Sequence, residues 1–153
     1  MDGKYTKLNN YVTQQVTNLF PKNKVNSHSR ENTFIVSVYN KNLPEIFDFG
    51  EGKKHERKIE LKSWQKEILV HDYFIKGLFH SDGSYYLSNN RDFYNFTNYS
   101  KDIIEMYKES CNTLDIKFIE VNYDNGKNRI DHNRRNEVEK LKKLIGTKEI
   151  IVY

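Results

Sequence analysis

The sequence is poor in cysteine and has no long apolar run. Cys111 is the single cysteine among 153 residues, which excludes an internal disulfide and favours a reducing compartment. Because Cys111 falls in a helical pattern, we expect a buried structural thiol rather than a nucleophile. No apolar run approaches the length that spans a membrane, and the polar start "MDGKYTKLNN" gives no sign of a signal peptide. We therefore expect a cytoplasmic protein with no membrane partner.

Several catalytic signatures are also missing. The five histidines and the lone cysteine show no zinc spacing, and there is no P-loop, dinucleotide fingerprint or nucleophile elbow. These absences argue against a zinc enzyme and against a nucleotide cofactor. His80, two residues before Asp82, is expected on a helix surface.

Aromatic and basic residues are plentiful by contrast. Aromatic residues make up 14% of the chain and the net charge is +4, so a folded core and a polyanionic partner are both plausible. The densest basic runs are "KKHERK" (Lys53–Lys58) and "KNRIDHNRR" (Lys127–Arg135). They are either solvated surface segments or contacts to nucleic-acid phosphates. The candidates for such contacts are Lys53, Lys54, His55, Arg57, Lys58, Lys127 and Arg129.

Hydrophobic periodicity predicts an α+β fold. Amphipathic helices are expected at Thr6–Phe20, over 63–81 with a break near His71, over 101–114 after a Ser100 cap, and at Arg134–Ile145. Strands are expected at Thr33–Tyr39, Ser84–Leu87, Asp92–Thr97, Lys117–Val121 and Arg129–His132. The later part thus has the order α-β-β-α-β-β-α.

The first part of the chain repeats part of that order. It has a helix, the start of a strand at Lys24–Asn26, a turn at "VNSHSREN" and the strand at Thr33–Tyr39, and it matches the later half of the longer unit in order and spacing. We expect residues 1–50 to be a truncated first half and residues 51–153 a complete unit, which together form one compact domain.

The stretch "FIKGLFHSDGSYY" (Phe74–Tyr86) combines two small residues with a carboxylate. Gly77 and Ser81 lie four apart on one helix face and allow another helix to approach closely, either inside the core or from a related helix. Asp82 is either an ordinary turn residue before Gly83 or a metal ligand at the negative end of the helix. Two such carboxylates from crossing helices would form an oxygen-rich Mg²⁺ site for phosphodiester hydrolysis.

These residues resemble a known family. "IKGLFHSDG" (Ile75–Gly83) is similar to the nine-residue LAGLIDADG motif, and the element order after it is that of the LAGLIDADG unit. The blocks "GEGKKHERKIELKSWQKEI", "FTNYSKDIIEMYKESCNTLDIKF" and "NRRNEVEKLKKLIGTK" resemble a bacterial and phage subgroup of LAGLIDADG homing-endonuclease-like proteins.

The resemblance implies a curved antiparallel sheet, backed by helices, that binds the DNA major groove. The motif helix would pack on its symmetry mate through Gly77 and Ser81. Asp82 would bind the metal together with a backbone carbonyl near Gly83, and Arg134 or Arg135 would lie near the scissile phosphate. Exposed strand residues would contact bases and phosphates; the candidates are Ser84, Tyr86, Arg91, Tyr94 and Asn95.

The sequence contains one motif, whereas single-chain members of the family carry two. Either a homodimer supplies the second aspartate or catalysis is absent. The first hypothesis is a Mg²⁺-dependent, site-specific endonuclease that binds double-stranded DNA. The alternatives are a catalytically inactive DNA-binding regulator and a phage or host protein-interaction module, such as an inhibitor, that reuses the fold.

Overall fold

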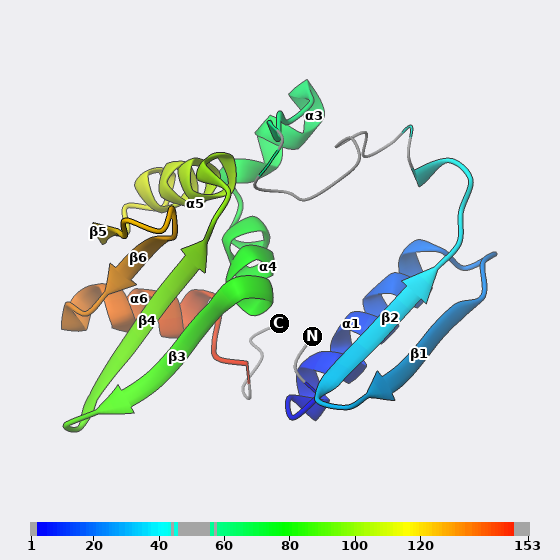
Figure 1. The fold of residues 1–153 in the computed structure, drawn as a ribbon, viewed down its shortest axis with the longest axis horizontal. Coiled ribbons are helices and arrows are strands. Elements are labelled where there is room, and N and C mark those ends of the chain that lie inside the picture. The colour runs from blue at the N-terminus through cyan, green and yellow to red at the C-terminus, as the bar shows by residue number, and fades with distance from the viewer. Residues whose placement is uncertain (1–2, 44, 46–55, 57, 149–153) are drawn as a thin grey trace. The chain divides into compact units, whose positions relative to one another are not determined.

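The computed structural model describes residues 3–43, 45, 56 and 58–148, and these form two compact units. The first unit contains α1 (Thr6–Leu19), β1 (Val25–Arg30) and β2 (Thr33–Val38), coloured blue to cyan in Figure 1. The second contains the described helices and strands from α3 to α6.

In the first unit, one helix accompanies an antiparallel hairpin. α1 ends just before Pro21, whose lack of an N–H group prevents the helix from continuing. β1 and β2 pair from Val25 opposite Val38 to Arg30 opposite Thr33. The polar segment 25–30 was expected mainly as a turn, and the structure makes it a strand.

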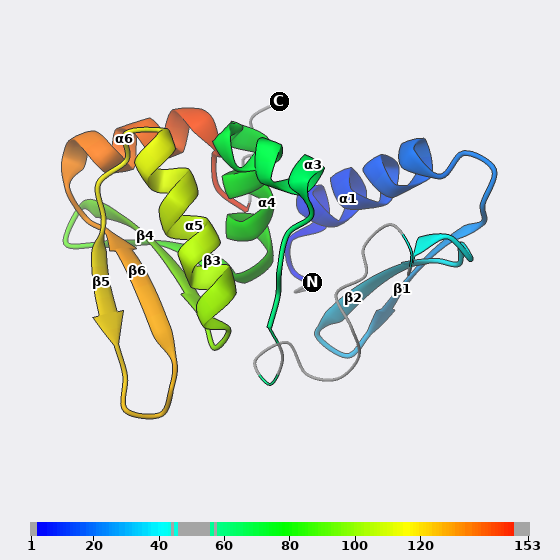
Figure 2. The ribbon, with the colours of Figure 1, turned by 90° about the horizontal axis from the view of Figure 1, so that it is seen from above.

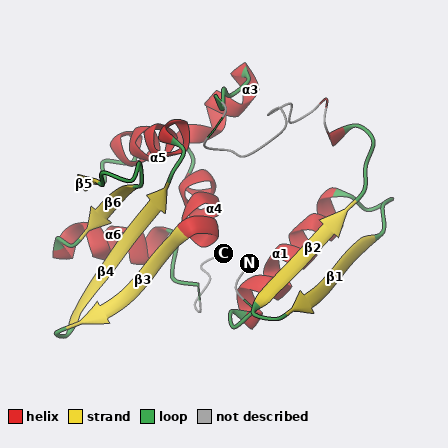
Figure 3. Ribbon diagram, viewed as in Figure 1, coloured by secondary structure: helices red, strands yellow, loops and turns green. Residues whose placement is uncertain are grey.

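The second unit follows the predicted order. After α3 (Ser63–Lys66) and the short 3-10 helix η1 (Glu67–Val70) come α4 (Asp72–Asp82), β3 (Gly83–Ser88), β4 (Arg91–Asn98), α5 (Lys101–Thr113), β5 (Ile119–Asn122), β6 (Asn128–His132) and α6 (Arg135–Leu144). Figure 3 distinguishes these helices and strands by colour. The predicted break near His71 is confirmed, since this residue has extended backbone between η1 and α4.

The four strands of this unit form one antiparallel sheet in the order β3-β4-β6-β5. Asn89 and Asn90, both with positive φ, join β3 to β4 in a tight turn of the kind that favours asparagine. Gly126, with φ of 79°, serves the hairpin between β5 and β6. The α+β fold class expected from the sequence is therefore confirmed.

Helices α4, α5 and α6 all cover the same face of this sheet (Figures 1 and 2). Strand residues of one parity point into the core between sheet and helices, as the alternating burial of β4 and β6 shows. The core contains Ile75, Phe79, Tyr94, Phe96, Ile104, Tyr107, Cys111, Ile116, Ile130, Val138, Leu141 and Ile145. The opposite face, formed by residues of the other parity, is not covered by these helices.

Candidate functional site

Asp82 ends α4 with an exposed side chain, and Gly83 begins β3 immediately afterwards. Gly83 has ordinary extended backbone, with φ of −80° and ψ of 165°. A Cβ at this position would lie 2.2 Å from Cδ2 of Phe79 and 2.6 Å from its carbonyl oxygen. The glycine is therefore required by close packing on Phe79 rather than by turn geometry. That packing fixes the point at which the chain leaves the helix and presents Asp82.

Asn98 positions the Asp82 carboxylate. Its Nδ2 donates to Oδ2 of Asp82 at 3.0 Å, while its Oδ1 accepts from the backbone N–H of Ser100 at 3.0 Å. Asn98 is 3% exposed, so both contacts hold the amide in one orientation. The donor is uncharged and the helix end is electrostatically negative, so the carboxylate remains suited to binding a cation.

The uncovered face of the sheet begins beside this carboxylate. On β3 and β4, Ser84 lies opposite Asn95, Tyr86 opposite Phe93, and Ser88 opposite Arg91. Further across the sheet, Thr97 of β4 lies opposite Arg129 of β6. We call this surface the open face; its residues are Ser84, Tyr86, Ser88, Arg91, Phe93, Asn95, Thr97, Arg129 and Asp131.

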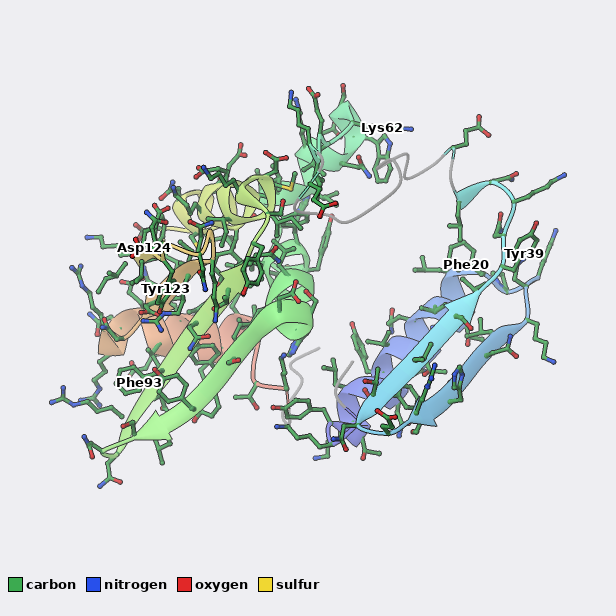
Figure 4. All side chains as sticks on the ribbon, in the orientation of Figure 1. Phe20, Tyr39, Lys62, Phe93, Tyr123 and Asp124 are labelled. Carbon is green, nitrogen blue, oxygen red and sulfur yellow. The ribbon has the colours of Figure 1, made fainter. Side chains whose placement is uncertain are left out.

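Most of the strand residues expected to contact DNA lie on the open face. Ser84, Tyr86, Arg91, Asn95 and Arg129 all do so. Arg129 is held there by its ion pair with Asp131, at 2.8 Å, and by the ring of Tyr123, at 5.5 Å. Figure 4 marks Tyr123 on the adjoining segment.

The structure corrects the expected position of Tyr94. It was expected on the exposed side of β4, but it is fully buried, and its hydroxyl donates to the Gly146 carbonyl at 2.8 Å. Its ring packs against Phe79 with centroids 5.1 Å apart. Neighbouring residues of a strand point to opposite faces, so Tyr94 and Asn95 cannot both reach a ligand on the open face.

The basic runs are only partly described. Lys127 lies between β5 and β6, with its ammonium 5.8 Å from the Tyr123 ring. Lys58 forms an exposed ion pair with Glu60 at 3.2 Å. The other predicted contacts of that run, Lys53, Lys54, His55 and Arg57, lie outside the described residues.

The structure does not bring Arg134 and Arg135 to Asp82. Arg134 precedes α6, and Arg135 pairs with Glu139 at 3.0 Å. Arg135 lines a hollow of about 560 Å³ with Asn90, Arg91, Asp92 and Asn133, at the turn between β3 and β4.

Asp82 lies at the opposite end of those strands. The six residues of β3 separate the two ends by about 17 Å. It is instead the end of α6 that approaches α4, where Nε2 of His80 contacts the Ile145 carbonyl at 3.1 Å. Within one chain, neither arginine therefore lies beside Asp82, and their expected place near the scissile phosphate stays a prediction. His80 is itself buried rather than on the helix surface.

Gly77 and Ser81 present an open surface on α4. Both are exposed, and no described atom outside the local helix lies within 4 Å of a Cβ built at Gly77. The Ser81 hydroxyl donates to the Leu78 carbonyl at 2.8 Å, which keeps this side chain against its own helix. The described part of the chain contains no group of three histidine, cysteine or acidic side chains able to hold a metal ion.

Sequence reasoning missed Asn98 and Phe93. The signal for Asn98 was its place two residues before the Ser100 helix cap, where an asparagine side chain readily accepts from the backbone. The signal for Phe93 was its parity, which it shares with Asn95.

The fold is thus that of an α+β domain, with an antiparallel sheet covered by helices on one face and open on the other and a carboxylate at the end of the helix beside it. The family model for the LAGLIDADG-like domain matches residues 70–147, slightly more than half of the chain. The chain therefore belongs to the LAGLIDADG-like family. No helix within the described ranges is long and apolar enough to cross a membrane.

The fold is also similar to that of the homing endonuclease I-DmoI, solved in complex with DNA and Mn. The TM-score is 0.59 at 15% sequence identity, and the match covers 90% of this chain and 72% of that one. Comparison with the sequences of curated proteins gives no match. At this identity the structural likeness establishes the fold.

Proposed function

We propose that this protein binds double-stranded DNA across the open face and hydrolyses a phosphodiester bond beside Asp82 with Mg²⁺. The observation that carries the proposal is the placement of Asp82. Its carboxylate is exposed at the end of the motif helix, oriented by Asn98, and adjoins a sheet face that the described helices α4, α5 and α6 leave uncovered.

The side chains of the open face support DNA as the ligand. Ser84 and Asn95 offer hydrogen-bonding groups side by side, and Arg91 and Arg129 offer cations that suit phosphates or guanine. A two-stranded β-ribbon is narrow enough to enter the major groove. I-DmoI, whose fold is similar, was solved with DNA.

The donors at Asp82 suit a hard divalent cation. The Asp82 carboxylate would hold it, with the backbone carbonyl of Gly83 as the second candidate ligand, and both are the oxygen donors that Mg²⁺ prefers. When bound, such an ion activates water and stabilises the leaving oxygen in phosphodiester hydrolysis. Asn98 would keep the carboxylate pointed at it.

One carboxylate is half of such a site. We propose that a second copy of the chain supplies the other through the exposed Gly77–Ser81 surface, where small side chains allow two helix backbones to approach closely. This arrangement would place two Asp82 residues at the shared ends of the crossed helices.

A non-catalytic DNA-binding regulator is the second candidate. It is favoured by one observation, namely that the Asp82 carboxylate already has a partner in the protein, the side-chain amide of Asn98. In that case Asp82 would be a structural partner of Asn98, and the open face alone would carry the function.

The experiment compares binding and cleavage of DNA in the full-length protein, Asp82→Asn and Asp72→Asn. Asp72 is an exposed carboxylate at the other end of α4, so its substitution is a matched control. We expect Asp82→Asn and EDTA each to abolish cleavage while binding persists, and Asp72→Asn to cleave normally.

Each proposal has its own contradicting result. Intact DNA after incubation of bound protein with Mg²⁺ would rule out the endonuclease and leave the regulator. A flat mobility-shift titration at low salt would rule out both.

A further inference from the structure

An aromatic pair occupies the middle of the open face. Tyr86 of β3 and Phe93 of β4 are directly opposite each other, and their rings stack with centroids 5.1 Å apart and planes 5° apart. Tyr86 is 46% exposed. Figure 4 marks Phe93 on this hairpin.

This pair is separate from the hydrophobic core. The core rings on the same two strands, Tyr85 and Tyr94, point to the covered side, where their centroids lie 5.1 Å apart. A cross-strand aromatic pair does stabilise a hairpin. That role alone does not require two large rings on the solvent side of a sheet whose neighbouring positions are polar.

The aromatic pair lies between two cross-strand pairs of polar residues. From the hairpin turn towards Asp82, the open face presents Ser88 and Arg91, then Tyr86 and Phe93, then Ser84 and Asn95. Positions on one face of a strand repeat about every 6.8 Å. One DNA strand rises about 3.4 Å per nucleotide, so each step along this row spans about two base pairs.

The chemistry of the aromatic pair selects one base edge. Phe93 has no polar group, and Tyr86 has one only at the tip of its ring, so the stacked ring surfaces cannot replace the water that hydrogen-bonds to a purine edge or to the cytosine amino group. Thymine alone presents an apolar group, its 5-methyl, in the major groove. The pair is flanked by groups that can hydrogen-bond, so an apolar contact would be confined to one or two base pairs.

We propose that Tyr86 and Phe93 form a thymine-methyl contact and thereby determine part of the DNA sequence that this protein recognises. The inference rests on the proposed binding of duplex DNA by the open face. It places the methyl contact about four base-pair steps along the strand from Asp82, and it makes these two residues determinants of specificity rather than catalytic residues.

The test begins with the duplex that the full-length protein selects from a random pool at fixed salt. Each thymine of that duplex is then replaced by deoxyuridine, which removes only the 5-methyl group. We expect one or two positions to lose about fourfold in affinity, the effect of exposing one buried methyl group, while the remaining positions change little.

Variants assign the effect to the aromatic pair. In Tyr86→Ala, and separately in Phe93→Ala, the thymine and deoxyuridine duplexes should bind equally. Tyr73→Ala removes an exposed tyrosine of α4 that stacks on His71, just before that helix, and it should keep the full discrimination. Each variant is compared with itself on two duplexes, so a general loss of stability cancels.

Four results would overturn the inference, and they are distinguishable. If the wild-type protein selects no duplex, the proposed DNA binding fails and this inference fails with it. If it binds a duplex but tolerates deoxyuridine everywhere, or if Tyr86→Ala retains the discrimination, only the methyl contact fails. A preference for single-stranded DNA would indicate stacking on unpaired bases instead.

Discussion

At the scale of single residues, Gly83 has no room for a side chain. A methyl group there would overlap the Phe79 ring and the Phe79 carbonyl, at 2.2 and 2.6 Å. Phe79 is fully buried and cannot move away without disturbing the core. We expect Gly83→Ala to lower the free energy of unfolding by about 1–3 kcal/mol, measured by urea denaturation.

Gly77→Ala is the matched control, because its added methyl group would meet no described neighbour. Equal effects of the two substitutions would show that Gly83 is not constrained by packing.

His132 makes stability depend on pH. Burial lowers the pKa of its imidazole, against the weaker opposing influence of the Lys117 carbonyl, Glu137 and Asp131. In the folded protein, Nε2 lies 3.2 Å from the Tyr107 hydroxyl and Nδ1 lies 3.1 Å from the Lys117 carbonyl. A neutral ring protonated on Nδ1 satisfies both contacts, since it donates to the carbonyl and accepts from the hydroxyl.

The unfolded chain therefore binds a proton more readily than the folded protein does, and stability should fall as the pH drops below about 6.5. We expect a smaller difference in unfolding free energy between pH 7.5 and 5.5 in His132→Gln than in the wild type. His28→Gln, at an exposed position on β1, should leave the difference unchanged. The same pH dependence in all three proteins would exclude this role for His132.

The burial of single residues could be predicted from the sequence where the hydrophobic period of the helix determines which side chains face the core. Cys111 is buried as expected from its helical spacing, and burial raises the pKa of its thiol to about 12. Tyr94 was misplaced because β4 contains adjacent aromatic residues, either of which can fill a core. The Asp82–Asn98 contact joins residues sixteen apart, and no local pattern encodes it.

At the scale of elements, α4 contains a glycine that its own unit does not require. Glycine within a helix costs about 1 kcal/mol relative to alanine. Gly77 has an exposed position and no described neighbour that a methyl group would touch. We expect Gly77→Ala to stabilise the dilute protein by about 0.5–1 kcal/mol and to weaken self-association, measured by sedimentation over a concentration series.

The same experiment distinguishes a glycine that serves helix–helix contact from one that only destabilises α4. Stabilisation without any change in self-association would argue against a dimer through α4. Ser81→Ala, which keeps the surface small, should leave self-association intact.

Elements were predictable where turns and caps marked their ends. Ser100 accepts from the N–H of Ile103 at 3.5 Å, as its position before α5 predicted. α6 ends at Leu144, one residue before the expected Ile145, and Gly146 follows with φ of 67°. β1 was largely missed because five of its six residues are exposed and polar side chains dominate it, so only its pairing with β2 reveals the strand.

At the scale of the whole molecule, the two units share an order of elements. In the first, α1 precedes the β1–β2 hairpin, and in the second, α5 precedes the β5–β6 hairpin. We propose that residues 1–50 are a shortened copy of the unit formed by residues 51–153. The family match, over residues 70–147, falls in the longer unit.

DNA binding by a chain with a net charge of +4 should be strongly salt-dependent. If Lys127 contacts a phosphate, Lys127→Gln should reduce the slope of log affinity against log salt by about 0.9. Lys140 belongs to α6, on the helix-covered side of the sheet, and pairs with Asp115. Lys140→Gln therefore removes the same charge as a control. Equal slopes for the two variants, from mobility shifts at several salt concentrations, would remove Lys127 from the interface.

The burial of Cys111 leaves the native protein without a reactive surface thiol, since no other cysteine occurs in the sequence. A cysteine introduced at Asp72, which is exposed at the other end of α4 and lies off the Gly77–Ser81 face, would then be the only site open to maleimide chemistry in the folded chain. A spin label attached there would give a dipolar distance between two copies if their α4 helices cross, and no such signal from a monomer. Because the native thiol is buried, the proposed assembly can be measured without first removing a cysteine from the wild-type protein.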